Sequence, residues 1–429
     1  MSSDFQLLSE IANIQGGYAF KSVDFCSEGA AVIKIANIQP PVVSLANVDR
    51  VKNENLIGLD RFKLNDRDIL MAMTGATVGK VGRFKETETA YLNQRVARIF
   101  AKKGHEYDDF IYALISLNGF DKQIEGSASG SAQPNISTAG IGSVKVPVVS
   151  ECDQKYIGSF VCALDDRIAL LRETNATLEA IAQALFKSWF VDFDPVRAKQ
   201  EGREPEGMDA DTAALFPDSF EESELGLVPK GWRIGVLGDI ADTVRKQIFP
   251  SELHSELHYV GLEHMPRHSL SLNIWGNANG LESAKAAFSE GDILFGKLRP
   301  YFHKVVIAPF AGVCSTDILV CRSKQTAFYG VILMHLFSVK LIEYASRLSN
   351  GAKMPRINWK DIAAYSICIP PSIIADKYSK AVAPLFASMV ANAHRIQTLA
   401  SIRDTLLPRL ISGQLRLPEA EVIIEEAIA

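Results

Sequence analysis

The chain of 429 residues contains no apolar run that approaches the ~18 residues of a membrane-spanning helix. Its opening residues lack the basic-then-apolar order of a signal peptide. The six cysteines are scattered and form no CxxC pair, which is typical of reduced thiols in a cytosolic protein. We therefore expect a cytoplasmic protein with no membrane contact. With 47% apolar and 22% charged residues, the composition favours globular domains and excludes disordered or disulfide-stapled classes.

Signatures of catalysis are also missing. The sequence has no GxSxG, no HExxH, no Asn-Pro-Pro-aromatic quartet of amino-methyltransferases and no GxGxxG after a strand. Residues 75–81 resemble a P-loop, but only three residues separate the glycines, and Val81 stands where Mg²⁺ would need Ser or Thr. We expect a Gly-rich turn between strands here, no catalytic residues, and no cofactor bound by this chain.

A metal site is not expected either. Five of the eight histidines fall between 254 and 303, and His254 with His258 and His264 with His268 have the i,i+4 spacing of helix-borne ligands. The residues between these pairs, 259–263, have the pattern of a strand and a turn. Without a helix, the i,i+4 spacing does not bring the histidines together. A surface or ligand-facing cluster is the better interpretation.

A surplus of basic residues, usual in proteins that bind nucleic acid, is absent from the chain as a whole. The formal net charge is −5, from 45 Lys and Arg against 50 Asp and Glu. Residues 50–103 depart from this balance, with twelve basic against six acidic side chains. If the chain binds DNA, its positive charge is gathered locally, or a partner supplies more.

What the sequence does contain is an internal repeat. Residues 8–12, Leu-Ser-Glu-Ile-Ala, recur as Leu-Gly-Asp-Ile-Ala at 237–241, and Asp-Ile-Leu at 68–70 recurs at 292–294. Pro134 corresponds to Pro355, and the pair 146–147 corresponds to 369–370. The offsets stay between 221 and 229, which predicts a duplication whose halves are each large enough to form a domain.

Each half opens with short strand-like runs and closes with one long helical pattern, in which apolar steps of four and three continue for more than four heptads. The two helices either pack on their own domains or pair as an antiparallel coiled coil; we favour the pair, because seams of this length usually find a partner helix. The predicted seam consists of Leu164, Ile168, Leu171, Asn175, Leu178 and Leu185 in the first helix and Leu385, Met389, Asn392, Ile396, Leu399 and Leu406 in the second.

Polar residues and prolines refine this helical prediction. Asn175 and Asn392 resemble polar positions that fix the register of a coiled coil, and the repeat alignment sets them at different levels. Pro384 predicts a kink or an interrupted start, and Pro408 predicts an end or a bend in the last turn. The acidic pair at 165–166 is most simply solvated or partner-facing charge.

These patterns predict an α+β fold: two similar mixed α/β domains joined by two long antiparallel coiled-coil helices, with a pseudo-twofold internal repeat. We expect the first domain over 1–150, the first helix over 151–190, an acidic surface-exposed connector over 191–228, the second domain over 229–372, the second helix over 373–413 and an acidic tail over 414–429.

Basic and polar residues recur around matching turns of both halves. Arg, Asn and Gln make bidentate contacts with base edges in a major groove, and Lys takes phosphates. An ordinary charged surface explains any single one of these residues, whereas their recurrence favours DNA binding. The candidates are Lys80, Arg83, Lys85, Asn93, Gln94, Arg95, Gln133 and Asn135 in the first half and Lys297, Arg299, Tyr301, Lys304, Lys353, Arg356 and Asn358 in the second.

Several longer stretches resemble the specificity (S) subunit of type I restriction-modification systems. They are residues 178–195 (LEAIAQALFKSWFVDFDP), 216–232 (FPDSFEESELGLVPKGW) and 403–413 (RDTLLPRLISG), and the resemblance covers nearly the whole chain. It implies two target-recognition domains that each read one half of a split, asymmetric DNA site, joined by two spacer helices.

The resemblance also implies partners. Two adenine-N6 methyltransferase (M) subunits would carry S-adenosylmethionine and dock on the spacer helices, and two motor-nuclease (R) subunits would join them and use ATP and Mg²⁺. Alternatives are a specificity subunit of a methylation-only system or one that lacks the motor subunit, an enzyme with an unrecognised site, and a duplicated protein-binding adaptor.

Overall fold

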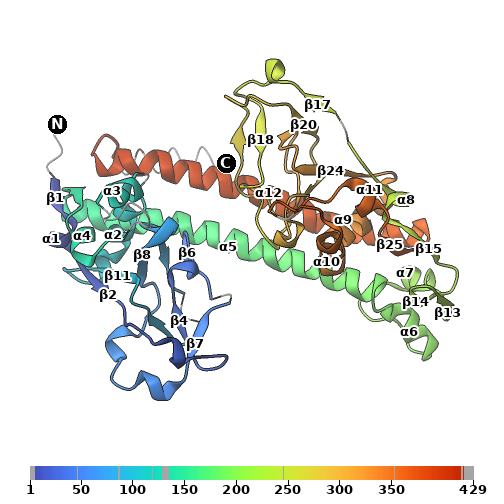
Figure 1. The fold of residues 1–429 in the computed structure, drawn as a ribbon, viewed down its shortest axis with the longest axis horizontal. Coiled ribbons are helices and arrows are strands. Elements are labelled where there is room, and N and C mark those ends of the chain that lie inside the picture. The colour runs from blue at the N-terminus through green and yellow to red at the C-terminus, as the bar shows by residue number, and fades with distance from the viewer. Residues whose placement is uncertain are drawn as a thin grey trace. The chain divides into compact units, whose positions relative to one another are not determined.

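The structure is a computed structural model that describes residues 5–45, 47–85, 87–117, 119–127, 135–244, 246–351, 353–416 and 419 (Figure 1). The chain forms two compact units, which we describe separately. The first unit comprises Met1–Ile168 and Thr398–Ala429, and the second comprises Ala169–Gln397. Each unit therefore contains one globular domain and parts of both long helices.

The first unit is built around a sheet with the strand order β2-β11-β8-β9-β6-β5, in which only β6 and β9 run parallel. Its strands are β2 (Ala12–Gly16), β11 (Val96–Ala101), β8 (Ile69–Ala72), β9 (Val81–Arg83), β6 (Val42–Val43) and β5 (Ile38–Gln39). A second sheet has the order β10-β4-β7-β3, with β10 (Ala90–Leu92), β4 (Ala30–Ile33), β7 (Asp49–Val51) and β3 (Phe25–Cys26).

Strand β8 lies between two hydrophobic cores. Side chains alternate between the faces of a strand, so Ile69 and Met71 enter one core and Leu70 and Ala72 enter the other. This explains why all four residues are apolar and buried. Short elements close the unit: α1 (Leu8–Ile11), α2 (Asp108–Ile115), α3 (Phe120–Ser127), α4 (Thr138–Gly142) and the antiparallel pair of β1 (Phe5–Leu7) with β12 (Lys145–Pro147).

The domain of the second unit repeats this topology. The order β2-β11-β8-β9 recurs as β16-β24-β21-β22, and the pair β1·β12 recurs as β15·β25. The strands are β15 (Arg233–Val236), β16 (Ala241–Thr243), β24 (Ile318–Ser323), β21 (Ile293–Gly296), β22 (Val305–Ile307) and β25 (Ser366–Ile369). Strand β21 also feeds two cores, with Ile293 and Phe295 in one and Leu294 in the other. The predicted repeat is thus confirmed at the level of fold.

The remaining elements of this domain follow the same plan. A sheet of order β17-β20-β23-β18-β19 contains β17 (Gln247–Ile248), β20 (Lys285–Phe288), β23 (Gly312–Cys314), β18 (His258–Val260) and β19 (Gly276–Asn277). The parallel pair of β18 and β23 matches that of β4 and β10. The helices are α8 (Leu237–Ile240), α9 (Tyr329–Phe337), α10 (Val339–Leu348) and α11 (Trp359–Ala363).

Two helices of 40 residues each dominate the fold: α5 (Glu151–Phe190) and α12 (Ser372–Ile411). In the second unit they run antiparallel, because Asn175 of α5 meets Asn392 and Ala182, further along α5, meets Tyr378, which comes earlier in α12. In the first unit Asp165 of α5 meets Arg403 of α12. All predicted seam residues are buried except Leu178, Leu185 and Leu385, which are half-buried.

The structure corrects two details of the helical prediction. The Nδ2 of Asn392 donates to the Oδ1 of Asn175 at 2.8 Å, so the two asparagines lie at the same level and not at different ones. Antiparallel pairing reverses the order of levels, which the repeat alignment did not take into account. Helix α12 also continues through Pro384 and Pro408, so neither proline marks its start or its end.

The connector over 191–228 is folded. It contains α6 (Asp194–Gln200), α7 (Ala210–Ala214) and the hairpin of β13 (Phe220–Ser223) with β14 (Gly226–Pro229). Phe193, Val196 and Phe216 are buried in the core of the second unit. Its acidic side chains are largely exposed, as predicted, but the aromatic residues between them make the segment part of the domain rather than a surface connector.

Among the described residues, no single helix is long and apolar enough to cross a membrane. One bent pair, Thr326–Phe337 with Val339–Leu348, passes by length and composition only, with a bend of 62°. Most of its apolar residues lie in the core of the second unit.

Candidate nucleic-acid interface

Three segments of the first domain meet beyond the end of β8. The backbone N–H of Met73 donates to the carbonyl of Arg95 at 3.0 Å, and the N–H of Ile136 donates to the carbonyl of Met73 at 3.0 Å. Thr74 and Asn135 form an isolated antiparallel bridge beside these bonds. We call this arrangement of the loop after β8, the turn before β11 and the segment at 135–136 the three-segment junction.

The junction surrounds an open hollow of about 370 Å³ with a mostly polar lining. Its lining includes Thr74, Gln94, Arg95, Asn135 and Ser137. Gln94, Arg95 and Asn135 are exposed, and Arg95 makes no ion pair with any residue that the structure describes. Three of the sequence-predicted candidates from distant parts of the chain are thus brought together on one accessible surface.

The second domain contains the same junction. The N–H of Lys297 donates to the carbonyl of Asp317 at 2.9 Å, and the N–H of Ile357 donates to the carbonyl of Lys297 at 3.1 Å. Leu298 and Arg356 form the isolated bridge that corresponds to Thr74 and Asn135. The backbone is conserved between the two domains, while the side chains differ.

At the second junction the guanidinium of Arg356 is bound by a carboxylate. Its Nε donates to Oδ1 of Asp317 at 2.9 Å and its Nη2 donates to Oδ2 at 3.3 Å. These hydrogen bonds raise the pKa of Arg356, so its guanidinium is charged at neutral pH. Asp317 was not among the predicted residues, because an isolated acidic residue in a sequence gives no sign of its partner.

Loop 297–304 follows β21 and carries two residues in the left-handed conformation, Arg299 (φ 51°) and His303 (φ 51°). The matching positions of the first domain, in the predicted Gly-rich turn, are Gly75 (φ 76°) and Gly79 (φ 80°). Glycine adopts this conformation freely, whereas other residues pay about 1 kcal/mol or more. The second domain therefore has an arginine and a histidine at the two positions where the first domain has glycine.

Contacts within the fold occupy four of the predicted candidates. Arg83 pairs with Asp109 at 2.6 Å, Asn93 is buried, and Asn358 caps α11 by accepting the N–H of Asp361 at 3.0 Å. The Nζ of Lys304 donates to the carbonyl of Leu262, and burial lowers the pKa of Lys304. We do not retain these four as proposed DNA contacts.

The other candidates lie outward. Lys80, Lys85, Tyr301 and Lys353 are exposed, and Lys297 and Arg299 are half-buried. Gln133 lies outside the described residues.

A pair of matching ion pairs was missed by the sequence analysis. Arg98 binds Asp68 at 3.1 Å and Arg322 binds Asp292 at 2.6 Å, in the same strands of the two domains. In both cases the two residues are 30 positions apart. That shared spacing in the two repeats is the signal that could have revealed them. Both carboxylates lie well inside the fold, so the pairs link strands and do not belong to the junctions.

Comparison with known proteins shows which proteins the chain resembles. The model of the type I restriction modification DNA specificity domain matches residues 3–180. The specificity subunit of the type I restriction enzyme MjaIX from Methanocaldococcus jannaschii is 27% identical over 360 residues, which cover 82% of this chain and 78% of that protein. The EcoDI specificity subunit from Escherichia coli is 27% identical over 330 residues, with coverages of 72% and 70%.

The crystal structure of a type I restriction-modification S subunit from M. genitalium covers 95% of this chain and 96% of its own, with a TM-score of 0.57 at 14% identity, and so shares the fold. The chain is similar to type I specificity subunits over most of its length. The resemblance seen in its sequence motifs is confirmed, and residues 3–180 match a DNA specificity domain.

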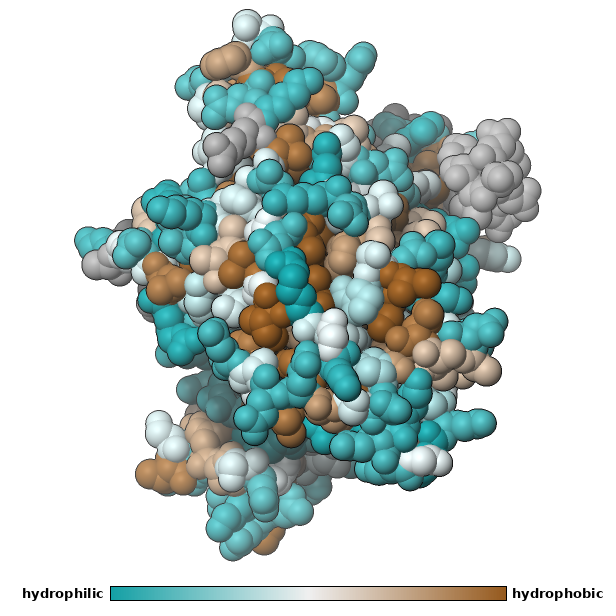
Figure 2. Space-filling model, turned by 90° about the vertical axis from the view of Figure 1, so that its right-hand side faces the viewer, coloured by the Kyte–Doolittle hydropathy of each residue, from teal (hydrophilic) through white to brown (hydrophobic). Residues whose placement is uncertain are grey.

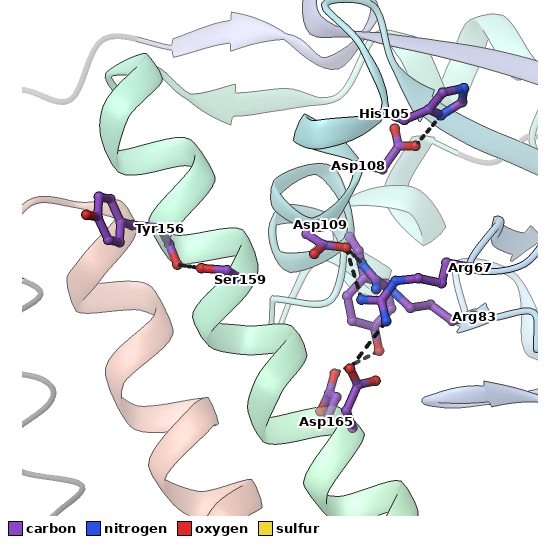
Figure 3. Close-up of polar contacts among 10 residues, drawn as sticks. Arg67, Arg83, His105, Asp108, Asp109, Tyr156, Ser159 and Asp165 are labelled. Atoms are coloured by element: carbon purple, nitrogen blue, oxygen red, sulfur yellow. Dashed lines mark hydrogen bonds and ion pairs between the residues drawn. The ribbon is translucent and has the colours of Figure 1, made fainter.

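In the first unit, a polar network attaches the domain to the long helices (Figure 3). The Oδ2 of Asp165 accepts from the hydroxyl of Tyr112 at 2.9 Å, and its Oδ1 accepts from Nη1 of Arg403 at 2.5 Å. Asp165 is 6% exposed, so the expectation that it carries solvated charge was wrong. Its neighbour Asp166 is exposed and meets Arg67 at 3.3 Å.

The same network continues to α2. Figure 3 shows Arg67 and Arg83 approaching Asp109 together, at 3.3 Å and 2.6 Å. Burial by itself would raise the pKa of Asp109, but the two guanidinium groups outweigh it and hold the pKa below its ordinary value. Arg83 also lies over the ring of Tyr112 at 4.3 Å, which places it inside the domain.

In the second unit, the domain is attached to the long helices mainly by aromatic packing. Trp189, Phe190 and Tyr378 lie in mutual ring contact, and Phe190 and Phe193 contact Trp232. The face at this end of the second unit shows apolar side chains near its middle with hydrophilic ones around them (Figure 2). An open groove of about 550 Å³ lies in the same unit, lined by Phe186, Met334, Phe337 and Val339 and by the charged side chains of Glu179, Lys187 and Lys340.

The predicted histidine cluster is divided in the structure. His268 and His303 stack at 4.6 Å, and the Nε2 of His303 lies 2.8 Å from the carbonyl of Phe337. His258 packs on Phe310 at 4.5 Å instead. In the described part of the chain, no group of three His, Cys, Asp or Glu side chains is arranged to hold a metal ion.

Proposed function

We propose that this chain is a specificity subunit that reads a bipartite, asymmetric DNA site, with one half-site for each domain. The single observation that carries the proposal is the three-segment junction, which occurs once in each domain on the same backbone hydrogen bonds but with different side chains. A shared scaffold with different exposed groups is what two different half-sites require, because base edges are distinguished by hydrogen-bond donors and acceptors.

We further propose that two adenine-N6 methyltransferase subunits dock on this chain and that two motor-nuclease subunits join through them. The net charge of −5 supports partners that share the phosphate contacts, since an acidic chain alone binds the DNA backbone weakly. The apolar groove beside the end of α5 supports docking in the second unit. S-adenosylmethionine, ATP and Mg²⁺ then reside on those subunits, and the assembly works in the cytoplasm, where it meets DNA.

The long helices support a spacing role in this proposal. A helix of 40 residues measures about 60 Å at 1.5 Å per residue. Half-sites one turn apart on B-DNA are about 34–36 Å apart, which is within that length. Removal of one heptad from both seams in matched register should therefore shorten the preferred gap between half-sites and leave each half-site unchanged.

The decisive experiment is the sequencing of methylated adenines in the native genome with and without the gene of this chain. We expect a single bipartite motif that disappears when the gene is deleted. Exchange of residues 1–150 for those of a relative should change one half-site only. Methylation of the same motif in the absence of the chain would overturn the proposal. The methylation-only alternative predicts that the strain with the gene methylates the motif but does not cleave unmodified DNA that contains it.

A further inference from the structure

We propose that the exposed side chains of the two junctions select bases: Arg95 and Asn135 in the first half-site, and Arg356, oriented by Asp317, in the second. This inference rests on the proposed function, because it requires that each domain reads one half-site. It goes further by naming the positions that determine specificity and the chemistry by which each acts.

The junction provides a rigid base for such contacts. The residue that follows the central strand, Met73 in the first domain and Lys297 in the second, makes two backbone hydrogen bonds. Its N–H donates to the turn before the next strand of the sheet, and its carbonyl accepts from the third segment of the junction. These bonds connect the junction to a buried strand. Arg356 is held further, because its N–H donates to the carbonyl of Asn350 at 2.9 Å and its carbonyl accepts in return at 3.0 Å. Side chains on a fixed backbone lose less entropy on binding than side chains on a mobile loop.

The first junction presents a guanidinium and an amide. Both Arg95 and Asn135 are exposed and line the same hollow, and Arg95 forms no ion pair within the described residues. Arginine makes two hydrogen bonds to O6 and N7 of guanine, and asparagine makes two to N6 and N7 of adenine. The first junction therefore fits a purine-containing half-site read from the major groove.

The second junction presents an arginine of fixed orientation. Asp317 accepts from Nε and Nη2 of Arg356, which leaves the Nη1 edge of the guanidinium for DNA. The ion pair is exposed at the arginine, so it contributes little to folding stability. We infer that its role is to hold the guanidinium in one plane before DNA binds, which makes Asp317 a positioning residue and Arg356 the contact with guanine.

The test is methylome sequencing of the chain co-expressed with its methyltransferase subunit in a host without other adenine methylation. We expect R95A and N135A to relax one or two positions of one half-site, with a loss of base discrimination of about 10- to 100-fold at each. R356A should do the same in the other half-site. D317N should relax that position less, by about 10-fold, and R356K should not restore discrimination because lysine cannot make the two-pronged contact.

Matched controls remove a charge elsewhere on the same domains. R61A and R347A replace exposed arginines away from the junctions and should keep both half-sites. If R95A or R356A does not assemble with the methyltransferase, the near-isosteric D317N and R95K variants, which keep the fold, carry the test. Unchanged half-sites in all junction variants that still methylate DNA would overturn the inference. Absence of any bipartite motif with the unmodified chain would overturn the proposed function instead.

Discussion

The two domains share one topology but are attached to the long helices by different chemistry. The first is attached by charges: Asp165 joins Tyr112 and Arg403, and Asp109 joins two arginines. The second is attached by a cluster of aromatic rings and by the hydroxyl of Tyr378, which donates to the carbonyl of Ala182 at 2.9 Å. Aromatic packing tolerates small shifts, whereas a buried charge demands its partner in place. The difference shows that the topology does not dictate the chemistry of attachment.

The largest effect should follow from breaking the ionic attachment. Asp165→Ala leaves the partly buried guanidinium of Arg403 without its main partner and should destabilise the first unit by about 3–5 kcal/mol. Hydrogen exchange of the Tyr112 segment in the full chain measures this. The control is Asp166→Ala on the adjacent exposed residue, which should cost less than about 1 kcal/mol. Equal effects of the two variants would show that the network is not what attaches the domain.

In the second unit, the corresponding polar contact is the asparagine pair. Asn392→Leu leaves the buried Oδ1 of Asn175 without its donor and should cost about 1–3 kcal/mol, as read from the thermal unfolding midpoint. The double variant N175L/N392L should recover much of that loss but let the helices pair in more than one register, which cysteine cross-linking detects. A single register in the double variant would assign register control to the rest of the seam.

A carboxylate in the second unit gives a pH-dependent comparison. Burial raises the pKa of Glu179 from 4.5 to about 6, although the N–H of Leu270 donates to it at 2.7 Å. The folded state binds this proton more tightly than the unfolded state, so the stabilisation is complete below about pH 4.5 and is lost as the pH rises through about 6. E179Q should therefore exceed the unmodified chain in stability by about 2 kcal/mol at pH 7.5. The two should converge near pH 4.5 in urea unfolding, and a constant difference at both pH values would contradict the raised pKa.

The smallest effect should come from the left-handed residues. Because Arg299 has φ 51°, Arg299→Gly should be more stable than Arg299→Ala by about 1 kcal/mol, the reverse of the usual order of these residues. In the first domain, Gly75→Ala should cost a similar amount, since an added Cβ would lie 3.9 Å from Cδ1 of Ile35, an ordinary van der Waals contact, and only the backbone conformation resists it. Differential scanning calorimetry resolves such changes. Equal stability of the two Arg299 variants would remove the argument for strain.

The sequence was sufficient for the features that depend on pattern. The repeat and the heptads predicted both domains and both long helices, because duplication preserves spacing and a helical seam has its own period. The junctions were predicted only in part. The sequence indicated Gln94, Arg95 and Asn135 by their chemistry, but it did not predict that they lie close together, because that depends on how the strands pair.

Side-chain environment was beyond the sequence. Arg83 and Arg95 are the same residue type and lie close in the sequence. Arg83 forms an ion pair with Asp109, whereas Arg95 is exposed. Asp165 and Asp166 differ in the same way, because one step along a helix turns a side chain by about 100° and so from the interior to solvent. The segment 191–228 was predicted to be a surface connector because it has many charged residues. Its packing against the domain depends on a small number of aromatic residues, among them Phe193 and Phe216.

Strands β8 and β21 each supply alternate residues to two separate hydrophobic interiors. A residue inserted within Ile69–Ala72 would turn the side chains that follow it in the strand toward the opposite hydrophobic core. Both cores would be disrupted by the same change. An insertion in the loop that follows would leave both interiors in place and would alter the three-segment junction. Under the proposed function, changes of DNA target are therefore expected in the loops that follow these strands and not within the strands themselves.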